Sequence, residues 1–220
     1  MKRTLTVSFL LACLVSFAAL AWGQGAYKTE SIGALNSPDV PKTLTDALEP
    51  QGTRLVNDKG APVSEVWLVK SVAPGAGGGS SDAVYPTLSV GELVGVLHFP
   101  GQGSDFRGQP IKPGYYTLRY AKMPQDGNHM GVNPYPDFLL MSPVAADTQI
   151  GQTVKVEDLI KLSKQASGTA HPAILSLVPV SQGAAFPSVV QDDQGHWALQ
   201  VKAGGSLPIA LILVGQVTAS

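Results

Sequence analysis

The chain has 220 residues, with 15 lysines and arginines against 16 aspartates and glutamates, so its formal net charge is -1. It therefore has no basic surplus that would hold nucleic acid or an anionic lipid surface, and we expect no nucleic-acid partner. Only 14% of the residues are charged, while 24 are glycine and 17 are proline, and this composition favours a fold rich in strands and turns over a helical one.

The first 23 residues have the layout of a secretory signal peptide. Lys2 and Arg3 are followed by an apolar run from Leu5 to Leu20 and then by small residues. We therefore predict a signal peptide at 1–23 and a secreted or periplasmic location, with membrane contact only during export or through an uncleaved N-terminus. Cys13, the only cysteine, lies inside this segment, so the remaining chain can form no disulfide and no cysteine metal site.

Residues 24–50 contain three prolines and are expected to be an extended lead-in with one turn of helix near 45–48. A single domain is predicted at 51–220. Glycine, proline and aspartate turns separate its apolar and β-branched runs. These runs predict strands at 53–57, 63–72, 92–99, 115–123, 137–142, 173–180, 196–202 and 207–216.

For two of these runs the sequence also predicts which side chains are buried. In the strand at 115–123, Tyr116, Leu118 and Tyr120 occupy alternate positions, which predicts one buried face and one exposed face. The run 209–214 is too short for a membrane helix and is expected to be a buried central strand.

One segment has the periodicity of an α-helix. Val156, Leu159, Ile160 and Ser163 recur at helical spacing, and Gly168 follows where a helix can end. The chain is therefore predicted to be mainly β, an antiparallel β-sandwich of about eight or nine strands with one inserted helix at 156–166.

Residues 112–118, KPGYYTL, resemble the turn and strand of transthyretin-like and carboxypeptidase-regulatory-like β-sandwich modules. The longer stretch 110–142 is similar to an uncharacterised family of secreted bacterial proteins. These resemblances imply an exported, β-rich architecture, and they imply no activity, because a fold alone does not fix a function.

The most unusual segment is the polar loop 124–137, because loops of this length are often functional. Asp126, Asn128 and His129, together with Asp137, offer oxygen and imidazole donors to a divalent ion. Their spacing matches no calcium or zinc motif, and turn formation is the favoured interpretation of these residues.

A second polar loop lies at 101–108. Asp105 and Arg107 are close enough in sequence to pair with each other or to hold a carboxylate or a sugar hydroxyl. Aromatic side chains can provide a platform for sugars, although in a β-sandwich they more often lie in the core. The candidates for such a platform are Tyr85, Tyr115, Tyr135 and Trp197.

These observations predict a binding or structural accessory module of the periplasm or cell surface, without a cofactor and without recognisable catalytic or metal residues. Its partner would be another protein or an envelope component. The candidate binding residues are Asp105, Arg107, Asp126, Asn128, His129 and Tyr135. One alternative is a metal-assisted hydrolase that uses the loop 124–137 and a second histidine. The other is a carrier of a small apolar ligand, suggested by the apolar run 207–215.

Overall fold

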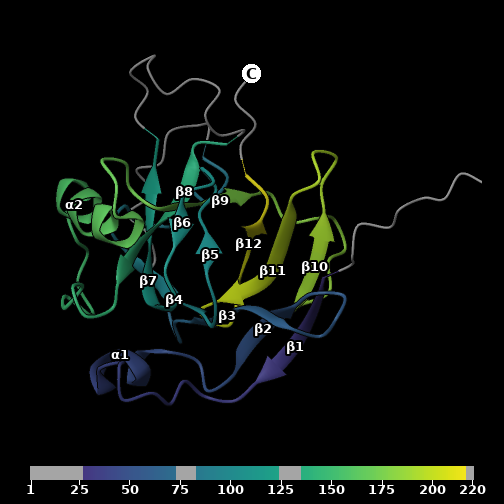
Figure 1. Ribbon diagram of the computed structural model, residues 1–220, viewed down its shortest axis with the longest axis horizontal. Helices are drawn as coiled ribbons and strands as arrows, with labels where there is room; N and C mark the ends of the chain where they lie inside the picture. Colours follow the sequence, from purple (N-terminus) through teal and green to yellow (C-terminus); the bar gives the residue numbers. More distant parts are fainter. Residues whose placement is uncertain (1–26, 73–82, 124–134, 217–220) are drawn as a thin grey trace, which may run out of the picture.

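The computed structural model describes residues 27–72, 83–123 and 135–216 (Figure 1). Ten strands form one antiparallel sheet in the order β1-β2-β3-β4-β7-β8-β9-β12-β11-β10. They are β1 (Lys28–Ile32), β2 (Gly52–Val56), β3 (Pro62–Leu68), β4 (Leu93–Phe99), β7 (Gly114–Lys122), β8 (Asp137–Pro143), β9 (Ile174–Val178), β10 (Ser188–Gln191), β11 (Trp197–Ala203) and β12 (Leu207–Val214). A small separate hairpin pairs β5 (Gly103–Ser104) with β6 (Pro110–Ile111).

The sheet curls into a nearly closed barrel, so the prediction of a β-sandwich with eight or nine strands is wrong in its architecture. The mainly β, antiparallel character is confirmed. Each strand pairs with the next in one continuous sheet, and the twist of ten strands brings its two ends round toward each other. Alternating sequences cannot distinguish these two arrangements, because both bury one face of every strand.

The edge strands β1 and β10 lie close to each other but are not hydrogen-bonded, which leaves a seam in the barrel (Figure 1). Tyr27, just before β1, bridges this seam at one end. Its ring packs edge-on against Trp197 of β11, with ring centroids 5.2 Å apart. The opposite end of the seam is bordered by Ser31 on β1 and by Pro187 before β10.

The main core fills the barrel interior. Alternate residues of β2, β3, β4, β7, β8, β9, β11 and β12 belong to one buried apolar cluster. Leu118 and Tyr120 of β7 are fully buried members of it, as their alternation predicted. The prediction that 209–214 forms a buried central strand is also confirmed, because β12 lies between β9 and β11.

Within the described residues, two helices lie outside the barrel wall (Figure 1). The sequence predicted one inserted helix at 156–166 and one helical turn near 45–48. The predicted helix is confirmed as α2 (Val156–Ser167), which ends at Gly168 in a left-handed conformation with φ 67°. The shorter α1 (Lys42–Ala47) buries Leu44 against the outer face of the sheet. Both α1 and β1 lie in the segment 24–50, and β1 pairs with β2 along its whole length.

No helix within the described residues is both long and apolar enough to cross a lipid bilayer.

Strand β7 has two buried faces, whereas the sequence pattern predicted one. Thr117 and Arg119 occupy the positions expected to face solvent, and both are fully buried. The cause is the segment between β8 and α2, which folds back over the outer side of β7. Alternation in the sequence predicts that one face of a strand is covered. It cannot predict that a loop 28 or more residues away in sequence will cover the other face.

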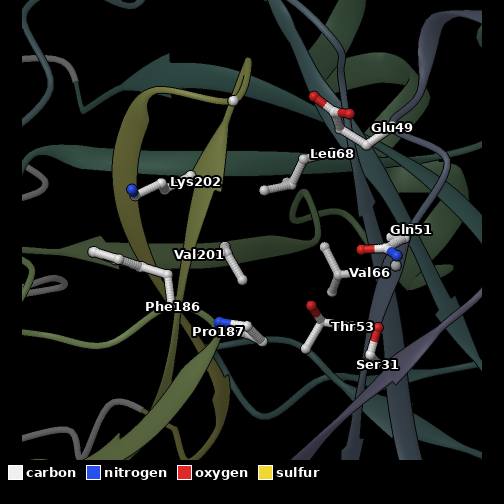
Figure 2. A pocket seen from close by; sticks show the side chains of 12 residues that line it. Ser31, Glu49, Gln51, Thr53, Val66, Leu68, Phe186, Pro187, Val201 and Lys202 are labelled. Carbon is white, nitrogen blue, oxygen red and sulfur yellow. The ribbon is translucent and has the colours of Figure 1, made fainter.

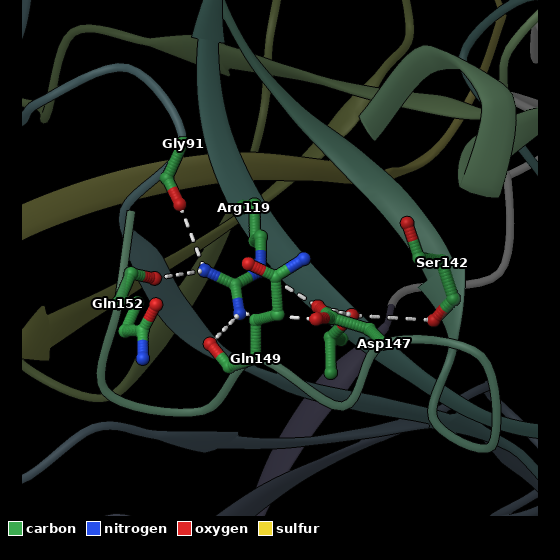
Figure 3. A network of polar contacts seen from close by, with 7 residues as sticks. Gly91, Arg119, Ser142, Asp147, Gln149 and Gln152 are labelled. Carbon is green, nitrogen blue, oxygen red and sulfur yellow. Dashed lines mark hydrogen bonds and ion pairs between the residues drawn. The ribbon is translucent and has the colours of Figure 1, made fainter. Parts of the chain in front are cut away.

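Figure 3 shows how Arg119 holds this covering segment. Its Nε and Nη2 donate to the two carboxylate oxygens of Asp147, at 2.6 and 3.0 Å. Its remaining N–H groups donate to the backbone carbonyls of Gly91, Gln149 and Gln152, at 2.7 to 2.8 Å. All five N–H donors of the guanidinium are therefore used. The cluster holds the covering segment against β7, and it has no donor left for a ligand.

Candidate functional site

A pocket of about 310 Å³ opens at the end of the seam opposite Tyr27 (Figure 2). Its walls come from both ends of the sheet, so residues about 170 positions apart in sequence meet there. The lining residues are Ser31, Glu49, Gln51, Gly52, Thr53, Val66, Leu68, Phe186, Pro187, Val201, Lys202 and Gly205. The unpaired edges of β1 and β10 create this opening, because continued hydrogen bonding would have closed the barrel over it.

One wall of the pocket carries uncharged polar groups. Ser31 and Thr53 are direct cross-strand partners on β1 and β2, and Gln51 precedes β2 on the same wall (Figure 2). Their hydroxyl and amide groups form no hydrogen bond to another group in the described part of the chain. Three polar side chains are therefore available to a molecule that enters the pocket.

The floor of the pocket is apolar and belongs to the barrel core. Val66 and Leu68 of β3 and Val201 of β11 line it, and each is buried. All three are members of the interior cluster. A ligand in the pocket would thus contact the main core directly, and this contact would remove apolar surface from water.

The two charged residues of the lining stand at the rim. Lys202 lies with its Nζ 5.2 Å from the centre of the Phe186 ring, and Figure 2 shows both side chains extending away from the centre of the pocket. Glu49 occupies the opposite rim (Figure 2), where its backbone N–H donates to the carbonyl of Leu68 at 2.8 Å. Neither side chain forms an ion pair within the described residues. The site is therefore neutral inside and carries one charge of each sign at its edges.

The binding residues predicted from the sequence lie elsewhere. Asp126, Asn128 and His129 lie outside the described residues. Tyr135 lines a different pocket, of about 360 Å³, together with residues of the turn before β11. The structure does not bring Tyr135 into the seam pocket.

Asp105 has a structural environment. Its carboxylate is 1% exposed and accepts hydrogen bonds from the backbone N–H groups of Arg107, Gln109 and Ile174, at 2.8 to 3.2 Å. The side-chain amide of Gln109 donates a fourth, at 2.7 Å. Asp105 therefore contacts Arg107 through its backbone N–H, and the two side chains form no ion pair among the described residues. These hydrogen bonds shape the loop and join it to β9.

Two histidines are held by carboxylates. His98 Nδ1 lies 2.8 Å from Glu65, and His196 Nδ1 lies 2.8 Å from Asp192. No group of three or more histidines, cysteines, aspartates or glutamates able to hold a metal occurs among the described residues. The hydrolase alternative depends on His129 and its loop, which lie outside that part of the chain.

Sequence reasoning did not single out the residues of the seam pocket. They are ordinary strand residues such as Thr53 and Val201, and only the curling of the sheet brings them together. Residues 28–32 carried the one local signal, but their polar and apolar side chains alternate too weakly for a strand to be recognised.

Comparison with known proteins gives no relative: no family model, no curated protein and no solved structure matches this chain.

Proposed function

We propose that this protein is an exported binding protein that takes a small organic molecule into the seam pocket between β1 and β10. The observation that carries the proposal is the composition of this pocket. Three polar side chains without partners in the described chain face an apolar floor that is continuous with the core. Concave sites with an apolar lining and a few placed polar groups are typical of small-ligand binding.

The N-terminal pattern at 1–23 supports an extracytoplasmic location for this activity. The volume supports a ligand at the small end of the usual range, because small-molecule pockets span roughly 300–1,000 Å³. This proposal is nearest to the carrier considered from the sequence, but no residue of 207–215 lines the pocket, and the ligand would enter at the seam and not between two sheets.

The hydrogen bonding of the hydroxyl groups in this pocket favours binding over catalysis. A serine or threonine nucleophile needs a hydrogen-bonded base to activate it. The hydroxyls of Ser31 and Thr53 have no such base among the described residues, and no histidine lines the pocket.

The test is a thermal-unfolding screen of the purified protein with a panel of small alcohols, ketones, acids, amines, sugars and aromatic compounds. A ligand that binds only the folded state stabilises it by about 2.7 kcal/mol at a hundredfold excess over its dissociation constant. We expect at least one compound to raise the melting temperature in a dose-dependent way.

Two tryptophan variants locate the response. Ser31→Trp fills the mouth of the pocket from an exposed strand position and should abolish it. Thr43→Trp places the same side chain on the exposed surface of α1 and should leave it unchanged. A response that survives Ser31→Trp would exclude this pocket, and a flat screen would contradict the proposed function.

A further inference from the structure

We infer that the ligand of the seam pocket is an uncharged amphiphile, with an apolar body and hydroxyl or carbonyl groups along one edge. This inference rests on the proposed function and specifies the chemical class that the site selects. It follows from where the neutral, apolar and charged groups of the lining stand.

The polar wall determines which functional groups the ligand carries along one edge. The hydroxyls of Ser31 and Thr53 can each donate and accept a hydrogen bond, and the amide of Gln51 can do both. None of these groups is bonded within the described chain. A hydroxyl or carbonyl group fits such a wall, because it can pair with a donor or an acceptor without bringing a net charge.

The apolar floor determines the body of the ligand. Val66, Leu68 and Val201 present only hydrocarbon, and Pro187, which lies beside Val201 in Figure 2, adds its ring. A molecule that lies on this floor with its polar edge toward β1 and β2 buries apolar surface and satisfies its polar groups together.

The position of the charges argues against an ionic ligand. An ionised group placed on the floor would lose water without gaining a counter-charge, which is strongly unfavourable. At the rim, Lys202 would attract an anion that Glu49 repels, and a cation would meet the reverse. The Lys202 ammonium also lies over the Phe186 ring, outside the centre of the pocket. Neither sign of charge is therefore favoured.

Four probes on one carbon skeleton test this class. They are 2-phenylethanol, phenylacetate, 2-phenylethylamine and ethylbenzene, each titrated into the purified protein by calorimetry at neutral pH and fixed salt. We expect the alcohol to bind roughly tenfold more tightly than either ion, because only the ions must bury a charge.

Variants of the polar wall separate hydrogen bonding from simple partitioning. Thr53→Val and Gln51→Leu keep the approximate size of the side chain and remove its hydrogen-bonding group. Each should weaken 2-phenylethanol by roughly threefold to tenfold and leave ethylbenzene unchanged. Equal losses for both probes would show that the wall acts only through shape and would overturn the role given to it.

The outcomes distinguish this inference from the proposal on which it rests. If either ion binds as tightly as the alcohol and Ser31→Trp abolishes its binding, the pocket binds ligands but the uncharged class is wrong. If none of the four probes binds and every screen ligand blocked by Ser31→Trp is an acid or an amine, the class is again wrong. If the screen is also flat, the proposed function fails with it.

Discussion

The guanidinium of Arg119 and the carboxylate of Asp147 face each other through two hydrogen bonds in a place that solvent does not reach. Arg119 belongs to the middle of β7, and Asp147 belongs to the loop that crosses over it. Thr117 donates a further hydrogen bond to the same carboxylate, at 2.7 Å. The pair thus joins the irregular loop between β8 and α2 to the barrel wall.

Removal of the Asp147 carboxylate should destabilise the protein severely. Asp147→Ala leaves Arg119 charged, buried and without a counter-ion, and breaking a buried pair in this way costs about 3–5 kcal/mol. Chemical denaturation gives the free energy of unfolding. The matched control is Asp46→Ala, which breaks the exposed Lys42–Asp46 pair and should cost about 1 kcal/mol or less. Similar losses in the two variants would contradict this view of the Arg119 cluster.

The hydroxyl of Tyr85 joins two neighbouring strands at one site. It donates to the carbonyl of Val178 in β9 and accepts from the backbone N–H of Ala210 in β12, at 2.9 Å. Tyr85→Phe keeps the packing of the ring and leaves the buried N–H of Ala210 and the carbonyl of the partly buried Val178 without this partner. We expect a loss of about 1–3 kcal/mol in unfolding free energy. Tyr115→Phe, on a half-buried ring that stacks on His98, is the control and should change little.

Alkaline stability depends on the same tyrosine. Burial raises the pKa of Tyr85 from 10.0 to about 12, with the nearby Asp137 charge adding to it, while the Ala210 hydrogen bond opposes the shift. The unfolded state therefore loses its proton at a lower pH than the folded state. The contribution of Tyr85 to stability is complete below pH 10 and is lost as the pH rises from 10 toward 12. Tyr85→Phe should flatten this part of the stability profile, and an unchanged slope would refute the assignment.

Acid stability depends on Glu65. Burial alone would raise its pKa, but hydrogen bonds from His98 and Arg54 and their charges outweigh burial, so its pKa is lowered from 4.5. The folded state then binds fewer protons than the unfolded state just below pH 4.5. Stability from Glu65 is present above that pH and is lost as the pH falls through the lowered pKa. Unfolding free energy measured from about pH 5 down to 3 should decline less steeply in Glu65→Gln than in the parent protein.

Gly91 tests how closely the covering segment approaches the barrel. Its φ is +86°, and an added Cβ would overlap the backbone carbonyl of Val154. Gly91→Ala should therefore cost about 2 kcal/mol or more, from strain at positive φ and from overpacking. At Gly33 an added Cβ meets nothing within 4 Å, so Gly33→Ala should be nearly neutral. Thermal unfolding compares the two, and equal melting temperatures would show that the segment can move away from Gly91 without cost.

Several elements could be read directly from local sequence. The helix at 156–166 was predicted to within one residue of α2, because its apolar positions recur at helical spacing and Gly168 supplies the left-handed end. Gly60 lies between the runs predicted as strands at 53–57 and 63–72, and its φ of 75° fits the glycine turns expected between such runs. Signals of this kind lie within a few residues of the structure they specify.

Other elements carried too little local signal. Strand β1 has the exposure pattern of an edge strand, with Lys28, Glu30 and Ser31 exposed, and β10 is only four residues long. Such strands have little apolar alternation because one edge and much of their surface meet water. Their positions at the two ends of the sheet nevertheless create the seam and the pocket.

The sequence by itself determined the antiparallel β character, the principal helix, most strand positions and the turns, because hydrophobic periodicity and glycine conformation act over short distances. Only the tertiary structure decided that ten strands curl into one barrel-like sheet, that Arg119 is buried on a face expected to be exposed, and that Ser31 and Thr53 meet Val201 around an opening. These features depend on which distant segments cover or adjoin a strand, and alternation along a single strand contains no record of that.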